Sequence, residues 1–332
     1  MAKVLIVGGA GYVGGWLTDQ ARRAGHEVLV FDRLLYEDSY MKDVQFVAGD
    51  VLDRRALRTH LLWADCVIWL AAIVGDPACA LDPELTIATN VDTVRNLAAD
   101  FGGRILFPST CSVYGAQDGE LTEESSLAPL SLYAETKIDA ERVLLDSGAD
   151  AIIFRLGTLF GLGDEFSRLR ADLVLNVLTI RAVLAGRMSV FGGRQFRPLL
   201  HVRDVSTAMV PNIDSSNNGI YNLHCENVTI LELAERIKAH VPEAKVSITE
   251  TSFQDSRNYS VSSAHAERDF GFAPRWSVDD GISEVAAVVR DGRIKDISIA
   301  RYSNHDALKP LLTSEKTPLG TIHAVRGRVG VI

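Results

Sequence analysis

The chain has 332 residues, of which 47% are hydrophobic and 23% are charged, as expected of a globular protein with one large α/β domain or two closely joined ones. Its formal net charge of −9, with no block of basic residues, argues against nucleic acids and anionic membranes as partners. No apolar run reaches the roughly eighteen residues that a membrane-spanning helix requires.

The first residues and the cysteines indicate a cytoplasmic protein. Met1-Ala2-Lys3 leads directly into a strand pattern, so we expect no signal peptide. The four cysteines, at positions 66, 79, 111 and 225, form no C-x-x-C pair and have no histidine at ligand spacing. We therefore expect reduced thiols and no metal site.

The first half of the chain alternates short apolar runs with helical stretches, which predicts a parallel sheet with crossover helices. The expected strands are Lys3–Val7, Glu27–Phe31, Val44–Ala48, Cys66–Leu70, Arg104–Pro108 and Ala151–Leu156, and the expected helices are Tyr12–Gly25 and Leu132–Leu145.

Beyond Gly161 the pattern loosens and predicts a smaller α/β part. We expect helices at Arg168–Leu184, Arg203–Val210, Thr229–His240 and within Phe272–Val289, and strands at Met188–Phe191 and Lys245–Thr249. This gives a first domain over residues 1–161, to which residues 197–225 could return, a second over 162–300 and a tail over 301–332. The tail has little periodicity and receives no role.

A glycine-rich turn follows the first strand and opens the first helix, with glycines at positions 8, 11 and 14. Missing side chains permit a tight turn and a close approach of the backbone to a pyrophosphate, which the helix N-terminus also attracts. A carboxylate at Asp32, after the second strand, is placed to bind a ribose diol and favours NAD over NADP, although Arg33 is adjacent. Asp50-Val51 is placed to meet the adenine or is a solvated turn. A glycine-rich turn without ligand is the alternative.

Tyr133 and Lys137 are four residues apart, which places a phenol and an ammonium on one face of a helix. A phenol titrates near ~10 in water, too high for a base at neutral pH. A neighbouring cation favours the phenolate, so the pair predicts a base that helps to move a hydride off a carbon bearing a hydroxyl. The alternative is a surface aromatic beside a solvated lysine.

Together these motifs resemble the extended short-chain dehydrogenase/reductases, and more closely their nucleotide-sugar epimerase/dehydratase branch. The resemblance covers residues 1 to about 290. It is carried, in order, by Gly8–Gly14, Asp32, Asp50-Val51, Ser109-Thr110-Cys111-Ser112-Val113-Tyr114-Gly115 and Tyr133-Ala134-Glu135-Thr136-Lys137. It implies a Rossmann-type doubly wound parallel sheet, of class α/β, with a smaller C-terminal α/β substrate domain, NAD as cofactor and a nucleotide-diphosphate sugar as substrate.

The resemblance also implies residue roles. Tyr133 would be the general base, Lys137 would bind the nicotinamide ribose and stabilise the phenolate, and Thr110 would bridge the substrate oxygen and Tyr133. The cofactor would contact Gly8, Gly11, Tyr12, Val13, Asp32, Arg33, Asp50, Val51, Leu70, Ala71, Ala72, Tyr133, Lys137 and Leu156. The substrate would contact Val74, Thr110, Ser112, Arg168, Arg170, Asn176, Arg197 and Arg257.

Some of these residues have a second interpretation. Arg197 and Arg257 occupy places where the family binds a nucleotide diphosphate, but surface salt bridges are the alternative. Asn90 and His201 match family positions that we interpret as structural, and Asp204 is expected to cap the helix that follows.

The family's 4,6-dehydratases carry Asp-Glu directly after the catalytic threonine, where this chain has Cys111 and Ser112. Neither is an acid at neutral pH, so elimination of water is disfavoured. The sequence then favours a nucleotide-sugar 4-epimerase, in which the hydride is returned. A 4-dehydrogenase that releases the ketone is the alternative, because Ala72–Gly75, Arg168–Asn176 and Asp255–Ser262 resemble such a subgroup.

Two further readings of the same chain are disfavoured. One is a 4,6-dehydratase and the other is a sensor that binds dinucleotide without catalysis. The family also suggests a homodimer formed by paired helices that include Leu132–Leu145.

Overall fold

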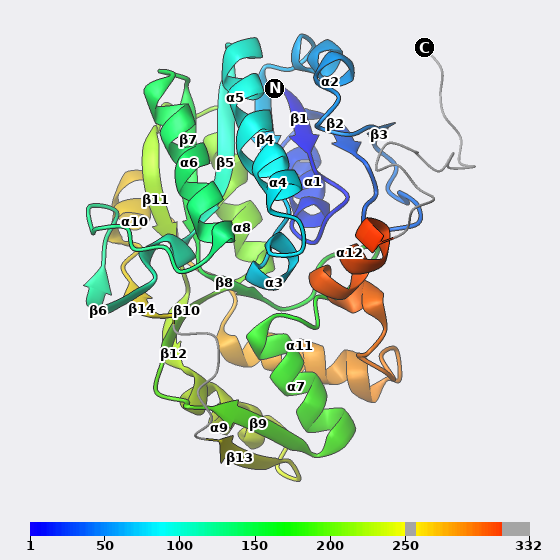
Figure 1. The fold of residues 1–332 in the computed structure, drawn as a ribbon, viewed down its shortest axis with the longest axis vertical. Helices are drawn as coiled ribbons and strands as arrows, with labels where there is room; N and C mark the ends of the chain where they lie inside the picture. The colour runs from blue at the N-terminus through cyan, green and yellow to red at the C-terminus, as the bar shows by residue number, and fades with distance from the viewer. Residues whose placement is uncertain (250–256, 314–332) are drawn as a thin grey trace.

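The computed structural model describes residues 1–249 and 257–313 (Figure 1). A larger part contains a seven-stranded parallel sheet, and a smaller part lies at the carboxyl ends of its strands. This confirms the predicted fold class. The division at residue 161 stays a prediction, as does a domain boundary at residue 300.

The seven-stranded sheet has the order β11-β7-β5-β4-β1-β2-β3. Its strands are β1 (Lys3–Val7), β2 (Glu27–Asp32), β3 (Gln45–Ala48), β4 (Cys66–Trp69), β5 (Arg104–Thr110), β7 (Ala151–Leu156) and β11 (Gly219–Leu223). The strand order reverses at β1, which has β2 on one side and β4 on the other. A ligand crevice is expected at this reversal, outside the carboxyl ends of the strands.

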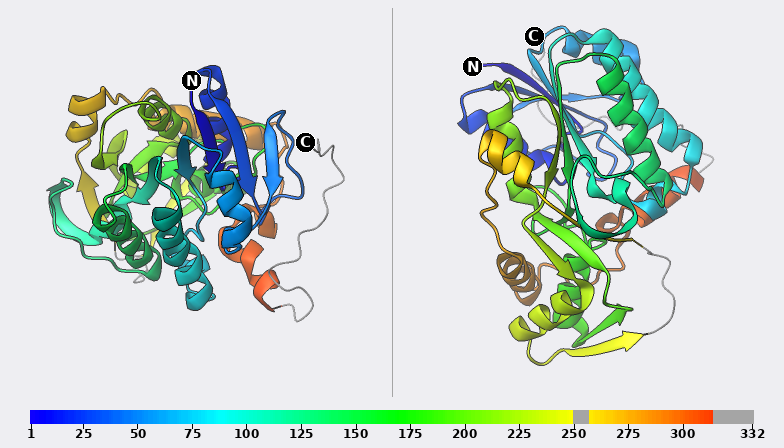
Figure 2. Two further views of the ribbon diagram at one scale, coloured as in Figure 1. Left: turned by 90° about the horizontal axis from the view of Figure 1, so that it is seen from above. Right: turned by 90° about the vertical axis from the view of Figure 1, so that its left-hand side faces the viewer.

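Helices cover both faces of this sheet (Figure 2). Alternate residues of β1 enter different cores: Val4 and Ile6 pack with α1 (Gly14–Arg23) and α8 (Val202–Met209). Leu5 and Val7 pack instead with the helices of the other face, α2 (Arg54–Leu61), α5 (Thr93–Asp100) and α6 (Leu132–Asp146). Strands buried on both faces explain the continuous apolar runs in the sequence.

The smaller part combines short sheets with three longer helices. A sheet of β12 (Glu226–Thr229), β10 (Phe196–His201) and β8 (Thr158–Phe160) adjoins the pairs β9 (Arg187–Phe191) with β13 (Lys245–Thr249) and β6 (Ala116–Leu121) with β14 (Asn258–Val261). The helices are α7 (Val174–Ala185), α9 (Ile230–His240) and α11 (Val278–Arg290), and the short α10 (Ala264–Phe270) packs on β11.

Two local predictions are wrong. The helix expected from Arg168 begins only at Val174, because the preceding backbone is held by distant groups: Glu37 accepts from the Arg168 N–H at 2.8 Å. Asp204 does not cap α8, because His201 does so by accepting from the Arg203 N–H. The buried carboxylate of Asp204 instead accepts from the backbone of residues 275 and 276.

The tail also contains structure that its sequence pattern did not predict. Asn304–Thr313 forms α12, which packs against the short helix α3 (Asp76–Cys79) (Figure 1). The rest of the tail, 314–332, and residues 255 and 256 lie outside the described residues. Within residues 1–249 and 257–313, no helix is long and apolar enough to cross a membrane.

Candidate functional site

One pocket lies at the carboxyl ends of β1, β2, β4 and β5, at the reversal of strand order. All fourteen residues expected to contact the cofactor line it: Gly8, Gly11, Tyr12, Val13, Asp32, Arg33, Asp50, Val51, Leu70, Ala71, Ala72, Tyr133, Lys137 and Leu156. The fold therefore brings the glycine turn and the Tyr/Lys helix, which are far apart in sequence, to a single cavity.

The three motif glycines are required for different reasons. A Cβ at Gly8, which has φ +84°, would lie 2.5 Å from the Ala71 nitrogen, and one at Gly14 would lie 2.3 Å from the Gly9 oxygen. At Gly11 the nearest protein atom would be the Gly8 oxygen at 3.3 Å. Protein packing thus excludes a side chain at Gly8 and Gly14. At Gly11 a side chain would instead occupy space in the pocket.

Substitution at these glycines is expected to separate binding from folding. Gly11→Ala should fold with nearly unchanged stability but bind NAD at least about tenfold more weakly, since its methyl group would occupy the approach to the pyrophosphate. Gly14→Ala should instead lower the melting temperature, because its methyl group meets backbone. Thermal melts of the proteins without ligand and calorimetric titration with NAD would test this, and equal NAD affinities for Gly11→Ala and the parent would contradict it.

Asp32 is fixed at the end of β2. Its carboxylate accepts from the Ala10 N–H at 3.0 Å and from the Leu34 N–H at 2.7 Å. Burial raises its pKa from the ordinary value, against these hydrogen bonds. Arg33 is paired with Asp50 at 2.9 Å, so its guanidinium is compensated by a carboxylate within the pocket wall. This arrangement suits a ribose diol better than a 2′-phosphate.

Tyr133 and Lys137 lie on α6, whose first turn is capped by Ser131. The Lys137 Nζ donates to the Pro108 oxygen at 2.9 Å and lies 4.6 Å from the centre of the Phe107 ring. Burial lowers the pKa of Lys137 from 10.5 to about 8. The ammonium is therefore held at the end of β5, facing the pocket.

The pKa of Tyr133 does not follow the sequence-based expectation. In the protein alone, burial raises the pKa of the phenol above its ordinary value of 10, and the neighbouring Cys79 and Asp76 add to this rise. Desolvation outweighs the lowering by Arg170, so the low pKa expected from the neighbouring lysine is wrong for the protein without ligand. Positive charge brought into the pocket would favour the phenolate.

The buried Lys137 predicts a specific pH dependence of stability. Below about pH 8 the residue is charged in both states and the folded state bears the full cost of burying it; between pH 8 and 10.5 the folded state loses the proton first and the cost is relieved. The free energy of unfolding of the parent should therefore rise relative to Lys137→Met by roughly 3 kcal/mol across this window, at ~1.36 kcal/mol per pKa unit. Urea unfolding of both proteins at the two ends of the window would measure it, and a constant difference would refute the assignment.

Asn90 holds the loop after β4 against α6, the helix that carries Tyr133 and Lys137. It lies in a π-helical turn, Ala88–Asp92, and its amide exchanges hydrogen bonds with both backbone groups of Ile73 at 2.8 and 3.0 Å. Its Nδ2 also donates to the Thr136 hydroxyl at 3.2 Å. The asparagine is 2% exposed, as expected of a structural residue.

A second polar cluster adjoins Thr110, the residue predicted to contact the substrate oxygen. Thr110 accepts from the Ser112 N–H at 3.1 Å, and the Ser112 hydroxyl lies 3.3 Å from both the Tyr259 hydroxyl and an Arg257 nitrogen. Arg257 is also 3.5 Å from a carboxylate oxygen of Asp76. Residues from three distant segments therefore surround the end of β5.

Of the other predicted substrate contacts, some line the pocket and others do not. Val74, Arg168 and Arg170 line the dinucleotide pocket, and Arg170 is paired with Asp172 at 2.6 Å. Arg197 is 4% exposed and donates to the Phe196 oxygen. Asn176 is fully buried and its amide bonds to backbone of Gly161 and Arg170, so it holds that loop and exposes no atom to a substrate.

Among the pocket residues that the sequence analysis missed are Tyr36, Glu37, Asn304 and Leu308. Tyr36 and Glu37 follow Asp32 closely and could have been found from that proximity. Nothing in the sequence pattern pointed to the two residues of the tail.

Comparison with known proteins identifies the family. Residues 4–223 match the profile described as "NAD dependent epimerase/dehydratase family". The chain belongs to this family. Membership confirms the predictions that the protein is an enzyme and that NAD is its cofactor.

The individual relatives have low sequence identity to this chain. UDP-glucuronic acid decarboxylase 1 of Danio rerio is 28% identical over 72% of this chain and 60% of its own length, so the match leaves much of that protein uncovered. UDP-N-acetyl-alpha-D-glucosaminuronate decarboxylase of Bacillus cytotoxicus is 27% identical over 87% of this chain and 98% of its length. The solved UDP-glucose 4-epimerase of Thermotoga maritima has a TM-score of 0.78 at 20% identity, covering 88% of this chain and all of the other, and shows the shared fold.

Proposed function

We propose that the protein is an NAD-dependent nucleotide-sugar 4-epimerase. The observation that supports this most is the meeting, in one pocket, of the glycine turn, the diol-binding Asp32 and the Tyr133/Lys137 face of α6. NAD, when bound, supplies the acceptor and later the donor of the hydride. Tyr133 takes the proton of the C4 hydroxyl during oxidation and returns it during reduction, and Thr110 orients the sugar oxygen.

To act as a base, Tyr133 needs positive charge close to its phenol oxygen. Burial holds the phenol in its neutral form in the protein alone. Lys137, fixed by the Pro108 oxygen, adds a cation on the same helix face. Each positive charge in this desolvated site favours the phenolate more than it would in water.

The residues after Thr110 disfavour reactions that need an acid at C5 or C6. Cys111 is fully buried and burial raises the pKa of its thiol, while Ser112 does not ionise in this range. Elimination and simple proton exchange at C5 would both need a proton donor here. A ketone formed at C4 therefore has reduction as its simplest fate.

A second candidate is a uronic acid decarboxylase, which the names of the two curated relatives favour. Oxidation at C4 makes a C6 carboxylate a β-keto acid, which loses carbon dioxide readily. Arg257 beside Ser112 offers a cation for such a carboxylate. The 4-dehydrogenase expected as the alternative from the sequence remains a third outcome.

An assay of the purified holoprotein with UDP-glucose, UDP-glucuronic acid and UDP-N-acetylglucosaminuronic acid would separate these activities. Interconversion of C4 epimers, seen by NMR, without net NADH supports the proposal. Release of carbon dioxide from either uronic acid indicates the decarboxylase, and stoichiometric NADH indicates the dehydrogenase. Either of these results without epimerisation of any sugar would refute the epimerase.

A further inference from the structure

The C-terminal segment Arg301–Leu312 reaches the dinucleotide pocket, although it lies well beyond residues 4–223 that match the family profile. Figure 1 shows α12, drawn in orange-red, at the junction of the two parts, beside α3 and near the carboxyl ends of β2 and β3. The segment supplies two wall residues of the pocket, Asn304 and Leu308.

Leu308 anchors the segment through apolar contacts. It is 1% exposed and belongs to a cluster with Ile73, Ala78 and Cys79, from the loop after β4 and from α3. Leu35 and Tyr133 pack against the same cluster, so it reaches from the loop that follows Asp32 to the proposed base. Deleting this side chain would open the cluster toward the pocket.

Asn304 fixes the segment through polar contacts. It is 3% exposed and uses three groups: its N–H donates to Asp172 at 2.9 Å, its Nδ2 donates to the Val74 oxygen at 2.8 Å, and its Oδ1 accepts from Arg168. One side chain thus joins the loop after β4 to the loop before α7. Both loops contribute walls to the pocket.

Arg168 is held in an unusual way for a buried guanidinium. Its donors go to the Arg301 oxygen at 2.6 Å and to Asn304, and its plane lies 4.2 Å from the centre of the Tyr36 ring. Among residues 1–249 and 257–313, no carboxylate forms an ion pair with it, and Asp172 and Glu37 act on its charge only from a longer distance. Burial lowers its pKa to about 10, so it is still charged at neutral pH. A buried charge held by neutral groups favours an anion nearby.

We propose that two residues of the C-terminal segment, Asn304 and Leu308, belong to the NAD site: Leu308 forms a wall, and Asn304 positions Arg168 to bind the diphosphate of the dinucleotide. Arg168 lines the same pocket as Gly11 and Asp32, and its own N–H is tied to Glu37, four residues after the Asp32-Arg33 pair. This assigns Arg168 to the cofactor in place of the substrate contact expected from the sequence. The nucleotide sugar carries a diphosphate too, and the experiment must separate the two sources.

The first test compares two leucines on the same helix. Leu308→Ala should raise the dissociation constant for NAD and the rate of exchange of bound NAD by about tenfold or more. Leu311→Ala, at a position 37% exposed, should leave both unchanged. Calorimetric titration and exchange with isotopically labelled NAD would measure them, with melting of the ligand-free proteins as the measure of folding. If Leu308→Ala lowers only the melting temperature while NAD affinity is unchanged, the segment has a merely structural role and the proposal is wrong.

The second test concerns charge. Arg168→Met should weaken binding of NAD by about tenfold or more and reduce the dependence of that binding on salt, but should leave binding of adenosine, which has no phosphate, unchanged. Asn304→Ala should show a weaker form of the same pattern, because the Arg168 guanidinium is still present but has lost the Asn304 acceptor that fixes it. Asn304→Asp, which keeps the acceptor for Arg168, should recover part of the affinity and so distinguish positioning from packing.

A third titration, with UDP-glucose on NAD-loaded protein, shows whether Arg168 binds the diphosphate of NAD or that of the nucleotide sugar. Loss of UDP-glucose binding with unchanged NAD binding in Arg168→Met would overturn the proposal and restore the substrate role. None of these measurements needs turnover, so they succeed or fail independently of whether the enzyme proves to be an epimerase.

Discussion

Replacing Tyr133 with phenylalanine is expected to reduce turnover by about 10²–10⁴-fold, the range typical of a lost general acid or base. The ring would still fill its place on α6 beside the cluster that contains Ile73 and Leu308, so the pocket should keep its shape. Only the oxygen that takes the C4 proton would be missing. The dissociation constant for NAD should change little, which calorimetric titration would show.

A matched tyrosine provides the control. Tyr302 is half-buried in a separate apolar cluster, and its hydroxyl makes no hydrogen bond with the described residues. Tyr302→Phe should have full activity and the same NAD affinity as the parent. If Tyr133→Phe turned over its sugar at the parental rate, the proposed role of the phenol would be refuted even though the family assignment would stand.

The parts of the site that could be predicted from sequence are those encoded by local spacing. The glycines at 8, 11 and 14 and the pair Tyr133/Lys137 belong to short motifs, in which the fold requires only a strand end or one helix face. Asp32 is predictable because it ends the next strand. All of these residues reach the pocket by the regular geometry of a parallel sheet.

What could not be predicted depends on contacts between distant segments. The loop before α7 was expected to be helical, since its composition permits a helix. Instead the Glu37 carboxylate accepts from the Arg168 N–H and the Asn304 N–H donates to Asp172, which hold the loop in another conformation. The helix α12 is short, contains Pro310, and is stabilised by its packing on α3. Local propensity says little about such a segment, because most of the stability of a short helix comes from tertiary contacts.

The sign of the pKa shift at Tyr133 shows the same limit for electrostatics. The four-residue spacing correctly places a cation on the helix face of the phenol, but it contains no information on desolvation. The shift depends on Cys79 and Asp76, some fifty residues earlier in the chain, and on packing that includes Leu308 of the tail. Sequence spacing can therefore identify which side chains meet in a site, but it does not determine whether desolvation or a neighbouring charge dominates the pKa.

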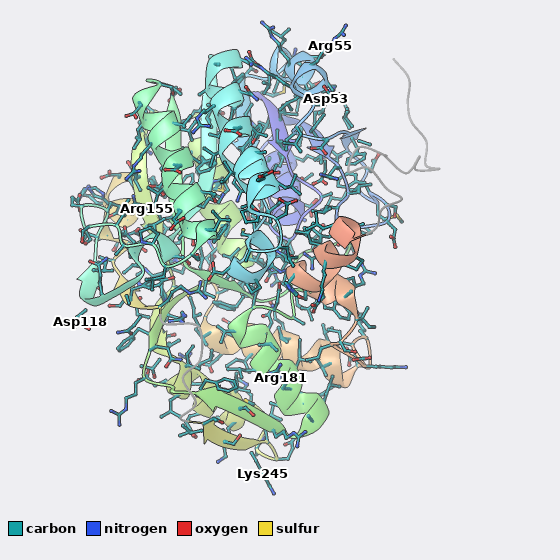
Figure 3. All side chains as sticks on the ribbon, in the orientation of Figure 1. Asp53, Arg55, Asp118, Arg155, Arg181 and Lys245 are labelled. Carbon is teal, nitrogen blue, oxygen red and sulfur yellow. The ribbon has the colours of Figure 1, made fainter. Side chains whose placement is uncertain are left out.

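Breaking the buried ion pair beneath the site is expected to have the largest effect on stability. Arg155 of β7 binds both carboxylate oxygens of Glu141 on α6, at 2.7 and 3.1 Å, with both side chains 3% exposed. Figure 3 shows Arg155 in the larger part of the molecule, next to α6. Ser109 also donates to Glu141, and Arg155 donates to the Tyr114 hydroxyl at 2.9 Å, so the pair joins β5, α6 and β7 directly below Thr110.

Arg155→Met should therefore lower the free energy of unfolding by about 3–5 kcal/mol, because it leaves an uncompensated buried carboxylate. The double variant Arg155→Met/Glu141→Leu should recover much of this loss. Arg142→Met, which removes an exposed pair with Asp139 on the same helix, should lose at most about 1 kcal/mol. Urea unfolding of the four proteins would measure these differences.

The activity of the double variant then decides what the pair is for. If the pair only stabilises the fold, the recovered protein should turn over at the parental rate. If it also fixes Ser109, and with it the neighbouring Thr110, turnover should remain low although stability has returned, because Ser109 would have lost its acceptor on α6. We expect the second result, since a displacement of the threonine oxygen by about 1 Å is enough to lower a rate by roughly 10²-fold.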